Sequence, residues 1–168
     1  MLSITEFQYD KINNENTVGT YKLGFAYHSG NFTNYSDSTV NKGNLSIYLI
    51  ANQYLTKKVG IFSQLGWSPS IKNINLFYAS LGFNYLGIGR RINDAFGFAI
   101  NYVRISEEFS SNYDPVKYPF ESAIELFYGI SINKNIWLQP DIQYIINPGV
   151  FSELSNALVG FVRLNLNF

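Results

Sequence analysis

Eight residues in the second half of the chain carry groups that could hold a small polar solute by reversible hydrogen bonds. Carboxylates and amides offer paired acceptors and donors, a guanidinium offers five N–H donors, and a phenyl ring offers an apolar face. Their chemistry is recognition rather than bond making. The set comprises Glu121, Glu125, Phe127, Gln139, Asp141, Gln143, Phe161 and Arg163.

The chain offers little material for catalysis or for a metal centre. It has no cysteine and a single histidine, His28, so thiolate chemistry and Cys/His zinc sites are excluded. No serine and carboxylate stand beside His28 in the sequence, and we expect it to be a solvated histidine at the rim of the structure. We therefore expect neither an enzyme, nor a cofactor, nor a bound metal.

Charge and composition set the chain apart from average soluble proteins. Twelve Lys and Arg balance twelve Asp and Glu, which leaves no electrostatic footprint for nucleic acid. Aromatic residues make up 17% of the chain and charged residues only 14%, whereas charged residues are roughly 25% of an average protein. The surface must therefore be compatible with its surroundings by some means other than charge.

Alternation of apolar and polar residues positions the candidate side chains. Residues 17–28, 74–87 and 120–132 each keep bulky apolar residues on one parity and small or polar residues on the other. This period of two is typical of half-buried β-strands. It predicts nine strands, at residues 3–12, 17–28, 44–55, 59–68, 74–87, 95–106, 120–132, 136–146 and 157–168.

Strand length and loop length both favour a membrane barrel. Most of the predicted strands reach the roughly 9–11 residues that a tilted strand needs to cross a bilayer. The connections alternate between short and long, with the longest at 29–43, 107–119 and 147–156. Outer-membrane barrels have short periplasmic turns and longer extracellular loops. The long connections are therefore expected outside the cell, and only the link 69–73 is shorter than this scheme predicts.

The two parities differ in a way that assigns them to lipid and lumen. The apolar parity is bulky and continuous and has aromatic residues near strand ends, at Tyr27, Trp67, Tyr102 and Tyr144. Such girdles mark membrane interfaces. The other parity holds the candidate residues among glycine, alanine and asparagine, which fits a wet lumen. We expect an all-β, transmembrane, antiparallel up-and-down barrel with outer-membrane lipid as its partner.

The last strand ends on an aromatic residue, Phe168, at the end of an alternating segment. A terminal aromatic of this kind is the pattern that outer-membrane assembly machinery reads. Phe168 is therefore a candidate assembly signal. Pro140, by contrast, cannot donate to the ladder inside its predicted strand, so we expect a bulge or a lost bond there.

Several segments resemble the carbohydrate-selective porins of the OprB family. They are GTYKLGFAYHSGNF (19–32), the stretch 62–101 with LGFNYLG (81–87), AIELFYGISINKNIWLQPDIQYIINPG (123–149) and ALVGFVRLNLNF (157–168). The resemblance implies a sixteen-stranded outer-membrane barrel that admits sugars by diffusion. It covers the C-terminal half of the family's pattern, so residues 1–168 would form one region of that barrel.

Strand parity leads to the same expectation without the resemblance. If the ninth strand ends in the periplasm, the first strand begins outside, whereas a complete bacterial barrel has an even number of strands. The N-terminal residues, MLSITEFQYD, also lack a basic and apolar signal peptide. The alternatives are an eight-stranded barrel of strands two to nine with a structural or adhesive role, or a soluble lipid-binding barrel.

Two interpretations of the eight candidate residues remain open. Sugars are neutral polyols, so a channel that favours them should offer bidentate polar groups and aromatic faces. The same charges could instead form a structural network in which Arg163 neutralises Glu125 or Asp141 across neighbouring strands. Lys57–Lys58 and Arg90–Arg91 fall in predicted periplasmic turns, where they are expected to be solvated and to anchor the rim.

Overall fold

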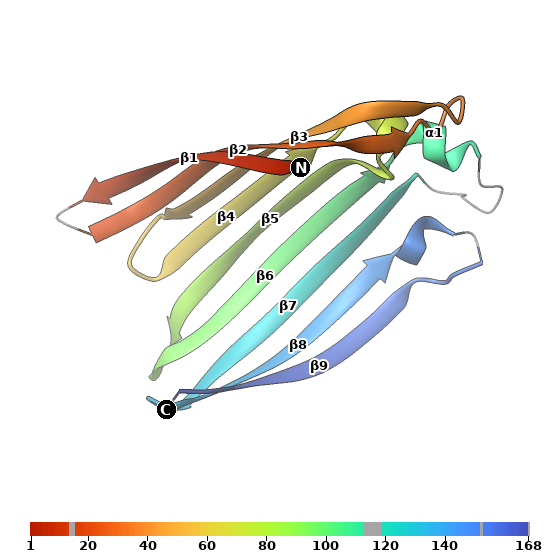
Figure 1. Ribbon diagram of the computed structural model, residues 1–168. Helices are drawn as coiled ribbons and strands as arrows, with labels where there is room; N and C mark the ends of the chain where they lie inside the picture. Colours follow the sequence, from red (N-terminus) through yellow and green to blue (C-terminus); the bar gives the residue numbers. More distant parts are fainter. Residues whose placement is uncertain (14–15, 113–118, 152, 168) are drawn as a thin grey trace.

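Nine antiparallel strands form one continuous sheet in the order of the sequence (Figure 1). The computed structural model describes residues 1–13, 16–112, 119–151 and 153–167. Each strand pairs with its neighbours along the chain, as the up-and-down prediction requires. The strands are β1 (Leu2–Asn13), β2 (Asn16–Thr33), β3 (Val40–Tyr54), β4 (Val59–Trp67), β5 (Asn75–Ile88), β6 (Arg91–Ile105), β7 (Phe120–Asn133), β8 (Ile136–Ile146) and β9 (Ala157–Leu166).

The nine predicted strands are all present, and the largest differences lie at the ends of β2, β3 and β6. The predicted loop 29–43 shrinks to 34–39, because the pairs Asn31↔Lys42 and Thr33↔Val40 continue the ladder beyond a register shift after His28. The gap between the predicted strands 74–87 and 95–106 shrinks to residues 89–90, with Gly87 and Gly89 at positive φ. Glycine meets that requirement without a Cβ clash.

The register separates an apolar face from a polar face throughout the sheet. On the apolar face, Leu49 lies opposite Leu23 and Leu65. On the polar face, Glu125 lies opposite Ala99 and Gln143. The assignment of the two parities to separate faces is therefore confirmed.

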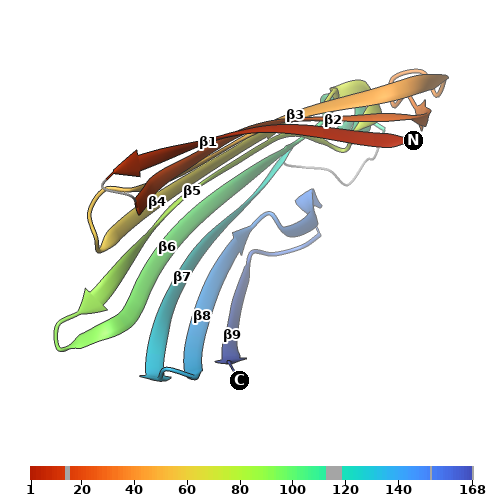
Figure 2. The ribbon, with the colours of Figure 1, turned by 60° about the vertical axis from the view of Figure 1, so that its left-hand side comes forward.

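The sheet is curved (Figure 2), and the exposure of its side chains shows which face lies on the inner, concave side. Apolar side chains splay apart and remain open, with Leu81 57% and Leu164 58% exposed. Residues of the polar face crowd together, and Ser80, Ala95 and Asp141 are buried. A curved sheet exposes its convex face and covers its concave one, so the apolar side chains point outward and the polar side chains point into the lumen.

Pro140 interrupts the ladder between β7 and β8 without changing its register. The pairs run to Phe127↔Asp141 and resume at Ile130↔Leu138, leaving the positions opposite Pro140 and its neighbour unpaired. On its other side Pro140 still pairs with Val162 of β9. The ladder is therefore interrupted at Pro140, as predicted. The register shift between β7 and β8 lies elsewhere, between Ser131 and Asn133.

The connections at one end of the sheet, including the short link between β4 and β5, carry short helical turns and contact one another. They contain η1 (Ser70–Lys72) between β4 and β5, α1 (Glu107–Ser110) between β6 and β7, and η2 (Pro148–Val150) between β8 and β9. The amide of Tyr35 donates to the carbonyl of Ile71 at 2.8 Å. The Tyr35 ring meets Phe109 edge-on at 5.3 Å. Connections far apart in sequence therefore brace each other.

Local hydrogen bonds shape these connections. The Ser106 hydroxyl accepts from the amide of Phe109 at 3.1 Å and so caps α1. In the connection 34–39, Asp37 accepts from both the amide and the hydroxyl of Thr39. The Thr39 hydroxyl bond, reinforced by its amide, holds the pKa of Asp37 below its ordinary value.

The sheet is open within the part of the chain that the structure describes. β1 pairs only with β2, and β9 pairs only with β8. The alternative in which strands two to nine close an eight-stranded barrel, with residues 1–13 outside it, is therefore wrong, because β1 extends the sheet by a full ladder. No helix among the described residues is long and apolar enough to cross a membrane.

Candidate functional site

Seven of the eight candidate residues meet on the inner face where β7, β8 and β9 run side by side. The register brings them together, because Asp141 of β8 lies opposite Phe127 of β7 on one side and Phe161 of β9 on the other. We name this group the β7–β9 cluster. It comprises Glu125, Phe127, Gln139, Asp141, Gln143, Phe161 and Arg163.

Arg163 is the only cation of the β7–β9 cluster, and two carboxylates share it. Its Nε lies 3.4 Å from Oδ2 of Asp141, and an Nη lies 3.6 Å from Oε1 of Glu125. Strong charge-assisted hydrogen bonds measure roughly 2.7–2.9 Å. The guanidinium therefore pairs loosely with both acids, and its side chain is 52% exposed. Its donors therefore remain accessible from the inner face.

Asp141 combines burial with incomplete hydrogen bonding. Its side chain has no exposed area. Oδ2 accepts from the amide of Gln139 at 2.9 Å, whereas Oδ1 is buried without a partner. An unsatisfied buried polar group costs roughly 1–3 kcal/mol. A hydroxyl donor that reached Oδ1 would remove that cost.

The remaining polar contact of the cluster fixes Glu125. The amide of Gln143 donates to Oε2 of Glu125 at 2.9 Å across the β7–β8 pair. That bond leaves Oε1 turned toward Arg163. A predicted structural network therefore exists, but it satisfies only part of the hydrogen-bonding capacity of the two acids.

The two candidate aromatic residues are oriented by their neighbours. Phe127 lies against Gly97 of β6, where an added Cβ would overlap the ring. Phe161 carries the guanidinium of Arg163 over its ring, 4.9 Å from the centroid. Each ring therefore has one face committed to the protein.

Glu121 does not belong to the β7–β9 cluster. It lies nearer the end of β7 that carries the long connections, and its Oε2 accepts from the amide of Gly149 at 2.6 Å. Gly149 belongs to η2, so Glu121 ties the β8–β9 connection to the wall. Sequence parity placed it correctly on the inner face but could not give this partner.

A second charged group on the inner face was missed by the sequence interpretation. We name Glu6, Lys22 and Tyr48 the β1–β3 cluster. Lys22 pairs with Glu6 at 2.9 Å, and the Tyr48 hydroxyl donates to Glu6 at 2.7 Å. The alternation of Glu6, Gln8 and Asp10 with apolar residues in 3–12 carried the signal that could have found it.

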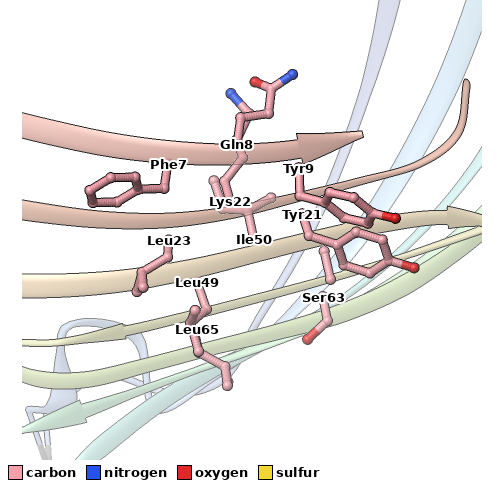
Figure 3. A pocket seen from close by; sticks show the side chains of 11 residues that line it. Phe7, Gln8, Tyr9, Tyr21, Lys22, Leu23, Leu49, Ile50, Ser63 and Leu65 are labelled. Carbon is pink, nitrogen blue, oxygen red and sulfur yellow. The ribbon is translucent and has the colours of Figure 1, made fainter. Parts of the chain in front are cut away.

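One hollow of the sheet lies on the outer face. It has a volume of about 460 Å³ between β1 and β4. Figure 3 shows its side chains, with Phe7, Leu23, Leu49 and Leu65 along the outer surface and Gln8 turned to the opposite side. An apolar hollow on the lipid-facing side does not supply polar recognition. The polar groups remain those of the inner face.

The remaining positions singled out by the sequence, His28 and Phe168, do not belong to the clusters of the inner face. His28 is exposed in β2, where its ring meets Phe32 edge-on at 5.3 Å and its Nδ1 accepts from the amide of Gly30. Within residues 1–13, 16–112, 119–151 and 153–167, no three His, Cys, Asp or Glu side chains gather as metal ligands. Phe168 lies outside the described residues.

Comparison with known proteins matches this fold and sequence to porins. The model of the carbohydrate-selective porin, OprB family, matches residues 1–168. Porin B of Pseudomonas aeruginosa is 24% identical over 94% of this chain and 43% of its own length. QuiX of Acinetobacter baylyi is 27% identical over 89% of this chain and 40% of its own length.

A solved structure shares the fold. The high-pH structure of Pseudomonas putida OprB superposes with a TM-score of 0.88 at 20% sequence identity. It covers 99% of this chain, which in turn spans 48% of that chain. The present chain therefore spans less than half the length of the relatives that it matches.

The nine-stranded curved sheet is thus a section of porin barrel wall, and its place is the bacterial outer membrane. With polar side chains inside, apolar side chains outside and the family match over its full length, the chain belongs to the carbohydrate-selective porin OprB family.

Proposed function

We propose that this chain forms part of the wall of an outer-membrane pore that passes small sugars by passive diffusion. The observation that carries the proposal is the unused hydrogen-bonding capacity of the β7–β9 cluster. Oδ1 of buried Asp141 has no partner, and the half-exposed guanidinium of Arg163 is only loosely paired. A polyol can accept from the exposed guanidinium, and it can donate to Oδ1 once the side chains that cover Asp141 move aside.

The cluster suits weak and reversible recognition. Conduction requires binding that is favourable enough for entry and weak enough for release. Loose contacts of 3.4 and 3.6 Å let Arg163 exchange a carboxylate for a sugar hydroxyl at little cost. Phe127 and Phe161 stand on either side of Asp141 and offer apolar edges to the C–H groups of a sugar ring.

The rest of the function follows from passive diffusion. The pore needs no cofactor and performs no catalysis, because the solute leaves unchanged. Its partners are the outer-membrane lipid around its apolar face, the sugars in its lumen, and the assembly machinery, for which Phe168 would serve as the signal. Glu121 supports the pore by holding the β8–β9 connection.

Glucose flux through a complete barrel tests the proposal. We suggest placing this chain in the matching segment of Porin B of Pseudomonas aeruginosa and measuring the swelling of proteoliposomes in glucose. Losing a hydrogen bond to a charged group costs roughly 1.5–3 kcal/mol, so Arg163→Met should lower glucose flux about tenfold at low concentration. Lys22→Met, in the β1–β3 cluster, should change flux by less than about twofold.

Two controls make the comparison decisive. The amount of folded barrel is read from heat-modifiable migration on gels, and the intact pore is read from its ion conductance. If Arg163→Met passed glucose as well as the unmodified chimera at equal folded amount, the β7–β9 cluster would be a structural network and the sugar-contact role would be wrong.

A further inference from the structure

Three of the four connections opposite the long ones carry a run of positive charge that the overall charge of zero conceals, whereas the fourth, at residues 14–15, contains Glu15. Three consecutive short turns follow one another along this edge of the sheet (Figure 1), between β3 and β4, β5 and β6, and β7 and β8. We name their basic residues the basic rim. It comprises Lys57, Lys58, Arg90, Arg91 and Lys134.

Almost no negative charge offsets the basic rim. Residues 54–60, 86–95 and 131–136 contain one acid, Asp94. Asp94 is 1% exposed. It accepts from Arg91, from the Tyr128 hydroxyl and from the amide of Ser131. It therefore neutralises Arg91 and stabilises the strand ends, while Lys57, Lys58, Arg90 and Lys134 are exposed.

The opposite end of the sheet has the reverse balance. In the described parts of the long connections, the charged residues include the acids Asp37, Glu107, Glu108 and Glu153, of which Glu107 pairs with Arg104 of β6 at 2.7 Å. Lys72, the basic residue of η1, donates a hydrogen bond from its ammonium group to the carbonyl of Gly43 at 2.6 Å. The two ends of the wall therefore differ in charge, although the chain as a whole is neutral.

Each of the three short turns also carries an exposed aliphatic side chain beside its basic residues. Leu55 is 60% exposed, Ile92 72% and Ile132 57%. In the sequence, all three continue the alternation that places Leu49, Phe98 and Leu126 on the lipid-facing side. An aliphatic group directed outward next to a cation suits the boundary between acyl chains and headgroups, where basic side chains reach phosphate and apolar ones enter hydrocarbon.

We propose that the basic rim, with Leu55, Ile92 and Ile132, binds the phosphate headgroups of anionic phospholipids in the periplasmic leaflet of the outer membrane. Short turns of outer-membrane barrels face the periplasm, so the leaflet in reach is the phospholipid one. An acidic soluble protein would meet the charges but would leave the three aliphatic side chains in water. The lipid accounts for both features.

Lipid binding to the purified chain tests this assignment. The chain in neutral detergent is titrated with short-chain phosphatidylglycerol, phosphatidylcholine or lipid A, and bound lipid is counted by native mass spectrometry. Each basic side chain near a headgroup surface contributes about fivefold in affinity at low salt. The variant Lys57→Gln/Lys58→Gln/Arg90→Gln should therefore bind phosphatidylglycerol at least tenfold more weakly. Arg91 is left intact because it pairs with Asp94.

Matched controls separate the site from general charge. Lys42→Gln removes one exposed cation at the other end of β3 and should leave binding unchanged, whereas Arg90→Gln alone should weaken it. Leu55→Ser/Ile92→Ser should also weaken phosphatidylglycerol binding. If a variant fails to fold, the unmodified chain still gives an answer, since added salt should weaken its binding of phosphatidylglycerol but not of phosphatidylcholine.

Three outcomes would overturn the proposal. The triple variant could bind phosphatidylglycerol as tightly as the unmodified chain. The unmodified chain could bind phosphatidylcholine equally well. The triple substitution could also abolish binding of lipid A while sparing phosphatidylglycerol, which would assign the rim to the outer leaflet.

Discussion

The two charged clusters of the inner face each pair a basic side chain with carboxylate, and they differ in how completely the carboxylate oxygens are hydrogen-bonded. In the β1–β3 cluster, both oxygens of Glu6 have close partners, Lys22 at 2.9 Å and Tyr48 at 2.7 Å. In the β7–β9 cluster, Arg163 stands 3.4 and 3.6 Å from its two acids, and Oδ1 of Asp141 has no partner. Both carboxylate oxygens of the β1–β3 cluster are therefore paired, whereas the β7–β9 cluster has a carboxylate oxygen and guanidinium donors without close partners.

Burial reinforces this difference. The side chains of Glu6 and Lys22 are each about one third exposed, where water can replace a lost partner. Asp141 lies between two phenyl rings and has no exposed side-chain area. Incomplete bonding is costly only where water is excluded. The unsatisfied oxygen of Asp141 is therefore a costly buried group rather than a loose surface contact, as the proposed binding role requires.

The largest expected effect comes from the glycines beneath the two clusters. Gly97→Ala would push the ring of Phe127 away from the wall, and Gly24→Ala would do the same to Tyr48. Overpacking of this kind costs roughly 1–3 kcal/mol. The free energy of unfolding of each variant, measured in urea, should therefore fall by about 2 kcal/mol. Only Gly97→Ala should also lower glucose flux in the chimeric barrel, because Phe127 borders Asp141.

Two companion variants check the steric cause. Gly66→Ala adds a methyl group where the nearest neighbour, Cβ of Tyr78, is at an ordinary 3.6 Å, and it should be nearly neutral. Phe127→Leu should restore most of the stability lost in Gly97→Ala. Equal losses at Gly66 and Gly97 would mean that strand glycine itself, rather than the ring above it, determines the cost.

The sequence predicts the strands well only where contact with lipid requires apolar residues at alternate positions. Strands and faces were predictable because hydrocarbon enforces strict alternation along each strand. The outer ends of β2 and β3 were not, since Gly30, Asn31 and Gly43 lie beyond the apolar segment and the pairing there follows a register shift after His28. Where no lipid selects apolar residues, the pattern carries no strand signal.

For the candidate site, the sequence predicts the face on which each residue lies but not its bonding partners. Parity placed all eight candidate residues on the inner face, but partners depend on the stagger between strands, which no single strand encodes. Glu121 therefore bonds to Gly149 and stands apart, and Arg163 reaches across β8 to Glu125. The β1–β3 cluster had the same alternation as the β7–β9 cluster and could have been predicted from it.

The next largest effect on stability is expected when the basic side chain of each cluster, Arg163 or Lys22, is replaced. Arg163→Met would leave Glu125 and Asp141 facing each other without a positive charge, one of them buried. We expect a loss of about 1–2 kcal/mol, below the roughly 3–5 kcal/mol of fully buried pairs, because Arg163 is half exposed. Lys22→Met should cost less than about 1 kcal/mol. Urea unfolding of both variants, followed by tryptophan fluorescence, gives the difference; a larger loss at Lys22 would reverse the assignment of the clusters.

The smallest change in stability is expected at Asp141, and it separates a binding role from a structural one most sharply. Asp141→Asn keeps the shape of the side chain and removes a buried charge that has an unsatisfied oxygen. Because that charge is held at a desolvation cost, the variant should be as stable as the unmodified chain or more stable by up to about 1 kcal/mol. Glucose flux should nevertheless fall, since a neutral amide oxygen is a weaker acceptor for a sugar hydroxyl than a carboxylate. Glu6→Gln should do the opposite, with slightly lower stability and unchanged flux, because both of its oxygens already bind protein donors. A side chain whose neutralisation stabilises the fold and impairs transport is retained for transport, whereas parallel losses of stability and flux at Asp141 would make the β7–β9 cluster a structural network like its counterpart.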